Sequence, residues 1–134
     1  KNRNFHQGDA AIAHRLLNAI EPGSYLAPHR HLDANKDETI VVLRGRLAVF
    51  FFDDDGNVRQ TVALSPLGAV CGVNIPHGEY HTVLALDPGT VMLEAKAGPY
   101  RPLAEAERAH WAPAEGEAEA LAYAQMLIAH CESL

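Results

Sequence analysis

The sequence predicts a single, mainly β domain over residues 1–134, with one helix near each end. Between residues 24 and 97, short apolar runs alternate with turn residues, which is typical of a β-sandwich or barrel. Outside this stretch, apolar residues recur at helical spacing. The 134 residues are 48% hydrophobic, enough for one core. We expect a barrel over about 22–98, an N-terminal helix over about 9–20 and a C-terminal helix over about 115–131.

The expected strands are rich in Val, Ile, Leu and Phe and end at Gly, Pro, Asn or Asp. The segment Asp53–Asn57 lies between two of them. It contains Gly56, which accepts a positive φ, and aspartates that can bond to their own backbone, so it predicts a hairpin turn. The strands are expected at residues 24–32, 38–43, 47–53, 58–64, 70–75, 80–86 and 90–97.

Both expected helices are defined by the spacing of their apolar residues. The first begins after Asp9, a good N-cap residue, and stops at Pro22 and Gly23. Its apolar stripe consists of Ile12, Leu16, Leu17 and Ile20. The second predicts a stripe that docks on the sheet or on a partner. Its members are Ala120, Leu121, Ala124, Leu127, Ile128 and Cys131.

Charge and hydropathy exclude several functions. The formal net charge of -6 and the absence of a Lys/Arg cluster argue against a nucleic-acid partner, which needs a basic face. The sequence contains no basic amphipathic helix of the kind that binds membranes. The longest apolar run, Leu47 to Phe52, is too short to cross a bilayer. Without a recognisable signal peptide, we expect a cytoplasmic protein. Cys71 and Cys131 belong to no paired motif and are expected to be reduced.

Two histidines and a glutamate in the stretch "PHRHLDANKDE" predict part of a metal site. In an extended strand, His29 and His31 point to the same side, about 6.5–7 Å apart, while Arg30 faces away. A turn through residues 33–37 can fold Glu38 back beside them. A single ion can bridge these three side chains.

The fourth expected ligand is His81, which follows a tight turn containing Pro76 and Gly78 in "GVNIPHGEYH". Three imidazole nitrogens and one carboxylate oxygen suit Fe, Mn, Ni, Co or Zn, and suit Ca or Mg poorly. We therefore expect one divalent transition metal ion as cofactor. The donor set does not rank these metals.

The spacing of these residues resembles the two cupin motifs. Gly23-x5-His29-x-His31-x6-Glu38-x6-Gly45 resembles the first motif, and Pro76-x-Gly78-x2-His81 resembles the second. The spacer before Glu38 is longer than the usual one, and this leaves three alternative ligands. They are Asp33, Asn35 and Asp37.

More of the chain is similar to the WbuC-type cupin fold metalloproteins found among bacterial polysaccharide genes. The matching stretches are "RNFHQ", "LLNAIEPGSYLAPHRH", "KDETIVVLRGRLAVFFFDDDG", "EAKAGPY" and "HWAPAEG". This resemblance implies a cupin double-stranded β-helix, or jelly-roll barrel. It also implies a metal held by His29, His31, Glu38 and His81, and a link to sugar metabolism through cupin phosphomannose isomerases.

Five further residues are candidates for the chemistry of the site. Glu94 and Lys96 share a strand face; facing inward they form a catalytic acid/base pair, and facing outward a surface pair. The charge of Lys36 suits it to attract an anionic substrate at the rim of the site. Tyr100 either closes the pocket mouth or caps the core. His77 either donates a hydrogen bond that supports a metal ligand or has an exposed or structural role within its turn.

The leading hypothesis is a metal-dependent, isomerase- or epimerase-like enzyme that acts on a small polar metabolite such as a sugar. Four protein ligands leave coordination positions open for a substrate. An iron-dependent dioxygenase would use the same ligands. A non-catalytic module that binds a metal or ligand is the alternative of another class. We also expect a homodimer, because a barrel of this size has strand edges and a sheet face to cover.

Overall fold

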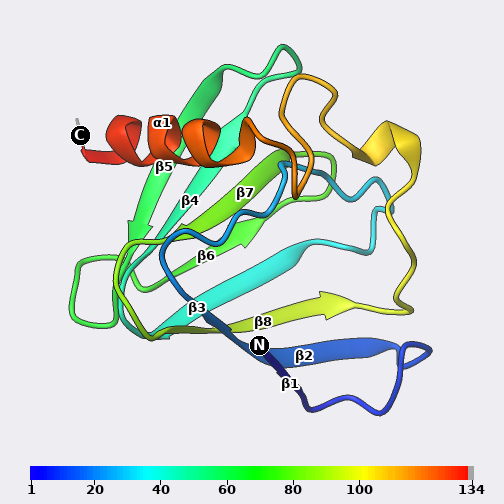
Figure 1. Cartoon of the computed structure of the whole chain (residues 1–134). Coiled ribbons are helices and arrows are strands. Elements are labelled where there is room, and N and C mark those ends of the chain that lie inside the picture. Colours follow the sequence, from blue (N-terminus) through cyan, green and yellow to red (C-terminus); the bar gives the residue numbers. More distant parts are fainter. Residues whose placement is uncertain (133–134) are drawn as a thin grey trace.

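Two antiparallel sheets pack face to face in the structure, a computed structural model that describes residues 1–132 (Figure 1). The larger sheet has five strands in the order β1-β2-β8-β3-β6. In chain order these strands are β1 (Asn2–Asn4), β2 (Ala13–Ile20), β3 (Glu38–Arg44), β6 (Gly72–Ile75) and β8 (Thr90–Ala97). The smaller sheet has the order β5-β4-β7. Its strands are β4 (Leu47–Phe52), β5 (Val58–Leu64) and β7 (Tyr80–Ala85).

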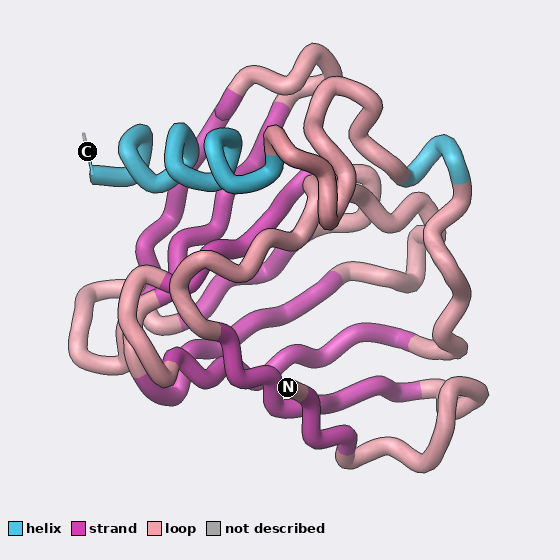
Figure 2. Tube along the Cα trace, in the orientation of Figure 1, coloured by secondary structure: helices cyan, strands magenta, loops and turns pink. Residues whose placement is uncertain are grey.

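Strands make up most of the regular structure, so the mainly β prediction is confirmed (Figure 2). One helix, α1 (Ala120–Glu132), lies against the outer face of the three-stranded sheet. A short 3-10 helix, η1 (Glu105–Glu107), lies in the long connection from β8 to α1. In this part of the chain, residues 1–132, no helix is long and apolar enough to span a bilayer.

Strand β4 is buried on both faces, which explains its unbroken apolar sequence. Alternate side chains of a strand point to opposite sides. Leu47, Val49 and Phe51 enter the core between the two sheets. Phe50 and Phe52 enter a second core beneath α1. The run that the sequence places in one strand therefore serves two separate cores.

The predicted N-terminal helix over residues 9–20 is wrong. Residues 13–20 form strand β2, in which each residue pairs with one of β8. Helical and strand periods both fit a short run that contains Leu16 and Ile20, so apolar spacing does not separate them. The free edge of β8 decides the outcome, because pairing satisfies the backbone groups of the whole segment.

Apart from shifts of one or two residues at several strand ends, the other expected elements differ from their bounds in two places. Residues 24–32 form no continuous strand; only His29 makes isolated bridges there, to His81 and Arg108. Helix α1 begins at Ala120 rather than near residue 115, because Gly116 has a φ of 84° and residues 115–119 form turns. The hairpin at 53–57 forms as expected, with the Asp53 side chain accepting bonds from the turn backbone.

The docking of α1 gives a stability prediction. Leu127 is 0% exposed and packs on the sheet, whereas Leu121 is 60% exposed. Leu127→Ala should lower the free energy of unfolding by about 2–3 kcal/mol, because it leaves a cavity that the helix can only partly close. Leu121→Ala should change it by less than about 0.5 kcal/mol. Urea denaturation measures both, and equal effects would contradict this packing.

Candidate metal centre

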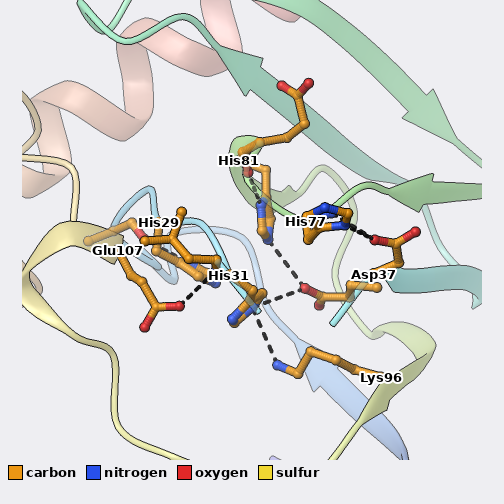
Figure 3. Close-up of polar contacts among 11 residues, drawn as sticks. His29, His31, Asp37, His77, His81, Lys96 and Glu107 are labelled. Atoms are coloured by element: carbon orange, nitrogen blue, oxygen red, sulfur yellow. Dashed lines mark hydrogen bonds and ion pairs between the residues drawn. The ribbon is translucent and has the colours of Figure 1, made fainter. Parts of the chain in front are cut away.

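Four side chains, one from each sheet and two from the loop before β3, meet in one cluster, of which Figure 3 labels the three histidines. His29, His31, Glu38 and His81 each offer one ligand atom, and these atoms lie within 4.8 Å of one another. Glu38 is the first residue of β3, and His81 is the second residue of β7. The two other histidines come from the loop before β3.

Backbone hydrogen bonds hold the histidine loop against β7. The His29 N–H donates to the His81 carbonyl at 3.1 Å, and the His81 N–H donates to the His29 carbonyl at 2.9 Å. The Gly78 N–H donates to the His31 carbonyl at 2.7 Å. Gly78 adopts a φ of 81°, which its turn requires and which larger residues disfavour. The loop is thus extended at His29 without being part of a regular strand.

Two of the rings have their proton positions set by backbone carbonyls. His29 Nδ1 lies 3.1 Å from the Ala27 oxygen, and His81 Nδ1 lies 2.9 Å from the Glu79 oxygen. A carbonyl oxygen only accepts, so Nδ1 carries the proton in both rings. In the neutral imidazole this leaves Nε2 with a free lone pair. Such bonds orient the histidine ligands of metal sites.

The carboxylate of Glu38 supports a cation at this point. Its Oε2 atom lies 3.3 Å from His81 Nε2 and 3.5 Å from His31 Nε2. Glu38 is 4% exposed, and Oε2 has no hydrogen-bond partner in the structure. With neutral rings, several acceptor atoms face one another in a buried space, which is costly unless a cation lies between them. The donor set therefore fits a divalent transition metal.

The side chain of Glu94 is hydrogen-bonded to that of Glu38. Burial, the hydrogen bond to Glu38 and the negative charge of Glu38 together raise the pKa of Glu94 to about 9, against the charge of Lys96, which lowers it. Burial alone would also raise the pKa of Glu38. The hydrogen bond from Glu94 and the adjacent rings of His31 and His81 outweigh it and hold that pKa well below its usual range. Glu94 is thus the protonated member of the pair.

His29 remains neutral over a wide pH range. Burial lowers its pKa to about 4, and the neighbouring His81 lowers it in the same direction. A neutral imidazole is the form that binds a metal. This ligand is therefore ready to bind without first losing a proton at physiological pH.

Of the three alternative ligands, Asp33 and Asp37 lie outside the cluster, and Asn35 is exposed. Asp37 accepts bonds from both the backbone N–H and Nδ1 of His77, each at 2.8 Å. Asp33 accepts the Asn35 N–H at 2.9 Å. The turn from Asp33 to Lys36 takes up the longer spacer, so that Glu38 still faces the histidines.

The strand β8 presents Glu94 and Lys96 to the centre. In the β3–β8 pair, Lys96 lies opposite Glu38, and Glu94 lies opposite Ile40, which belongs to the inner core. Directly opposite residues of an antiparallel pair share a face. The Lys96 Nζ atom also lies 3.4 Å from His31 Nε2. Both side chains therefore face the interior, the arrangement that a proton-transfer role requires.

A cavity of about 600 Å³ opens from the histidines. Lys36 and Tyr100 line it, and so do Glu94 and Lys96. Lys36 is buried, with Nζ bonded to the Pro99 carbonyl at 2.6 Å, whereas Tyr100 is 58% exposed. His77 does not line the cavity; its ring is directed at Asp37 (Figure 3).

The N-terminal strands contribute cavity residues that the sequence analysis did not single out. Asn4 lies on β1, and His14 and Asn18 lie on β2, where they alternate with residues that face away. The expectation of a helix over residues 9–20 hid this face. His14 and Asn18 share this face with the apolar Leu16, and the polar Arg15 lies on the opposite face, so no alternation of polar residues in the sequence identifies it.

Solved structures with the same strand arrangement identify the fold. KdgF from Halomonas sp. matches with a TM-score of 0.58 at 19% identity, covering 75% of this chain and 80% of KdgF. A cupin-2 domain protein from Shewanella frigidimarina matches with a TM-score of 0.53 at 22% identity, covering 72% and 79%. The chain has a cupin fold. A third cupin, oxalate decarboxylase from Lactobacillus farciminis, matches at 0.55 and 19%, covering 75% of this chain and 29% of that protein.

Sequence comparisons add less than the cupin structures do. A family model described as a domain of unknown function, DUF6016, matches residues 1–64. This segment contains His29, His31 and Glu38, but not His81. No curated protein matches the chain. The cupin fold and the four-residue cluster together support a metal-binding cupin.

Proposed function

We propose that this protein is a metal-dependent enzyme that moves a proton on a small polar substrate of the sugar class, as an isomerase or epimerase does. The observation that carries the proposal is the pair Glu94 and Lys96 beside the ligand cluster. A site that only held a metal or a ligand would not need a buried, protonatable carboxyl there.

Each residue has a defined task in this proposal. His29, His31, Glu38 and His81 hold the metal, which when bound polarises a substrate carbonyl and its neighbouring hydroxyl. The ionised form of Glu94 takes a proton from the carbon next to the carbonyl, and the protonated form then returns it to the adjacent carbon. The Lys96 ammonium offsets the negative charge that develops on oxygen. In an isomerisation the proton of the neighbouring hydroxyl passes to the carbonyl oxygen, so the step is balanced and no oxidant or reductant is needed.

The sugar class is supported by the lining of the cavity and by the sequence resemblance. Asn2, Asn4 and Asn18 line the cavity, and a side-chain amide both donates and accepts hydrogen bonds, as a hydroxyl-rich ligand requires. The resemblance to WbuC-type proteins extends the proposal to bacterial polysaccharide metabolism. A reaction on a small carboxylic acid is a second candidate, in keeping with the oxalate decarboxylase neighbour.

Deuterium exchange tests the proposal without a known product. The metal-loaded protein is incubated in D₂O with aldoses, ketoses and sugar phosphates, and NMR follows the hydrogen next to each carbonyl. We expect metal-dependent exchange for at least one sugar, without oxygen uptake. Oxygen uptake without exchange would favour an iron-dependent dioxygenase. Neither signal would favour a non-catalytic module and would contradict the proposal.

A further inference from the structure

A buried ammonium group next to the metal centre has no anionic partner. Lys36 is 9% exposed, and its Nζ atom makes one hydrogen bond, to the Pro99 carbonyl at 2.6 Å. Among residues 1–132, no carboxylate forms an ion pair with it. An ammonium has three donors, so two remain for another group. A buried charge without a partner is costly, which indicates that a ligand supplies the missing charge.

The acidic side chains nearest to Lys36 are held by other groups. Glu107 interacts electrostatically with Lys36. Its two carboxylate oxygens, however, accept the backbone N–H groups of Leu32 and Ala104, each at 2.9 Å. Asp33 accepts the Asn35 N–H. Neither carboxylate is free to approach Lys36 without giving up these bonds. Among the described residues, these two carboxylates leave Lys36 without a compensating negative charge, which an anion from outside the chain can supply.

The cations around Lys36 face the same space. Lys96 lines the main cavity with it, and Arg101 lines both that cavity and an adjoining one of about 80 Å³, which His31 and Lys36 also line. Arg101 is exposed, and its guanidinium has no partner among the described residues. Glu94 is the acidic residue that faces this group from β8. Asp9, Glu105 and Glu115 also line the cavity; Glu115 accepts the Ala27 N–H, and Glu105 lies 3.6 Å from His110. With a divalent ion bound, the positive charges of the ion, Lys36, Lys96 and Arg101 outnumber the negative charges of Glu38 and Glu94.

We propose that the ligand of this cavity is an anion, whose carboxylate or phosphate group binds the Lys36 ammonium beside the metal. Arg101 attracts the anion at the mouth, and Lys36 fixes it inside. Lys36 lines the cavity. The turn that ends at Lys36 places it two residues before the proposed ligand Glu38, so an anion bound to Lys36 lies close to the metal centre. The inference rests on the proposed function, and it narrows the substrate to acidic sugars or sugar phosphates.

Calorimetric titration of the cobalt-loaded protein with sodium phosphate and sodium acetate, at constant ionic strength, tests the inference. Glycerol serves as the neutral probe. We expect at least one anion to bind, and Lys36→Met to weaken it about tenfold or more, with bound cobalt unchanged. Lys36→Arg, which keeps the charge, should retain most of the affinity. Phosphate and acetate separate the two sources of the anionic group.

The outcomes separate this inference from the metal centre. If cobalt binds but neither anion does, or if Lys36→Met binds the anion as tightly as the natural protein, the inference is overturned and the metal centre stands. If no cobalt binds, the metal centre fails, and the same titration on the metal-free protein still decides whether Lys36 binds an anion. Thermal melting of both variants shows that they are folded.

Discussion

Replacing His31 with alanine should remove bound metal from the protein. His31 Nε2 lies 3.5 Å from Glu38 Oε2 within the ligand cluster, and its side chain is 12% exposed. Loss of supporting residues around a metal already costs about 10–100-fold in affinity, so loss of a ligand should cost more than about 100-fold. Elemental analysis and competition with a chelator measure the loss.

His77→Ala is the matched control for His31→Ala. It also removes one imidazole, but His77 is bonded to Asp37 outside the cavity. The control should retain its metal. Added metal should stabilise the natural protein and the control, by about 2.7 kcal/mol at a free concentration one hundred times the Kd, and should not stabilise His31→Ala. Equal metal content in all three proteins would contradict the assigned centre.

Glu94→Gln should lower the proposed proton-transfer rate by about 10²–10⁴-fold, the usual contribution of a general acid or base. The amide preserves the shape of the side chain but cannot take up a proton. The deuterium-exchange assay measures the rate, and metal content should be unchanged. A variant that exchanges hydrogen at the natural rate would remove Glu94 from the mechanism.

The same substitution has a structural readout in the metal-free protein. The pKa of Glu94 is raised from 4.5 to about 9 in the folded state, so the folded protein binds more protons than the unfolded chain between these values. The contribution of Glu94 to stability is fully present below about pH 4.5 and is lost as the pH rises toward 9. Glu94→Gln should lack this decline in thermal melting.

The ligand cluster can be predicted from the sequence because each part of it belongs to a short motif. His29 and His31 are two residues apart, and Gly78 sets the turn that leads to His81. Residues 24–32 form no regular strand, but His29 and His31 still join the cluster. The isolated bridge between His29 and His81 fixes the backbone at His29 and so orients its ring. The longer spacer before Glu38 is absorbed by a turn.

Long-range pairing limits what the sequence predicts elsewhere. Strand β2 owes its conformation to β8, whose paired residues lie 70 to 84 positions away along the chain. Apolar spacing alone does not reveal that partner. The burial of Lys36 is equally hidden, because it depends on the carbonyl of Pro99, which another part of the chain brings to the site. Loop lysines are mostly solvated, so composition points the other way.

The ligands Glu38 and His81 belong to different sheets, and this links chemistry to the mechanics of the barrel. Any ion held by both acts as a clamp across the open end, where the core between the sheets gives way to polar side chains. The distance between the sheets and the affinity for the ion then depend on each other. A core substitution that moves the sheets apart would therefore lower the affinity for the ion, although it changes no ligand.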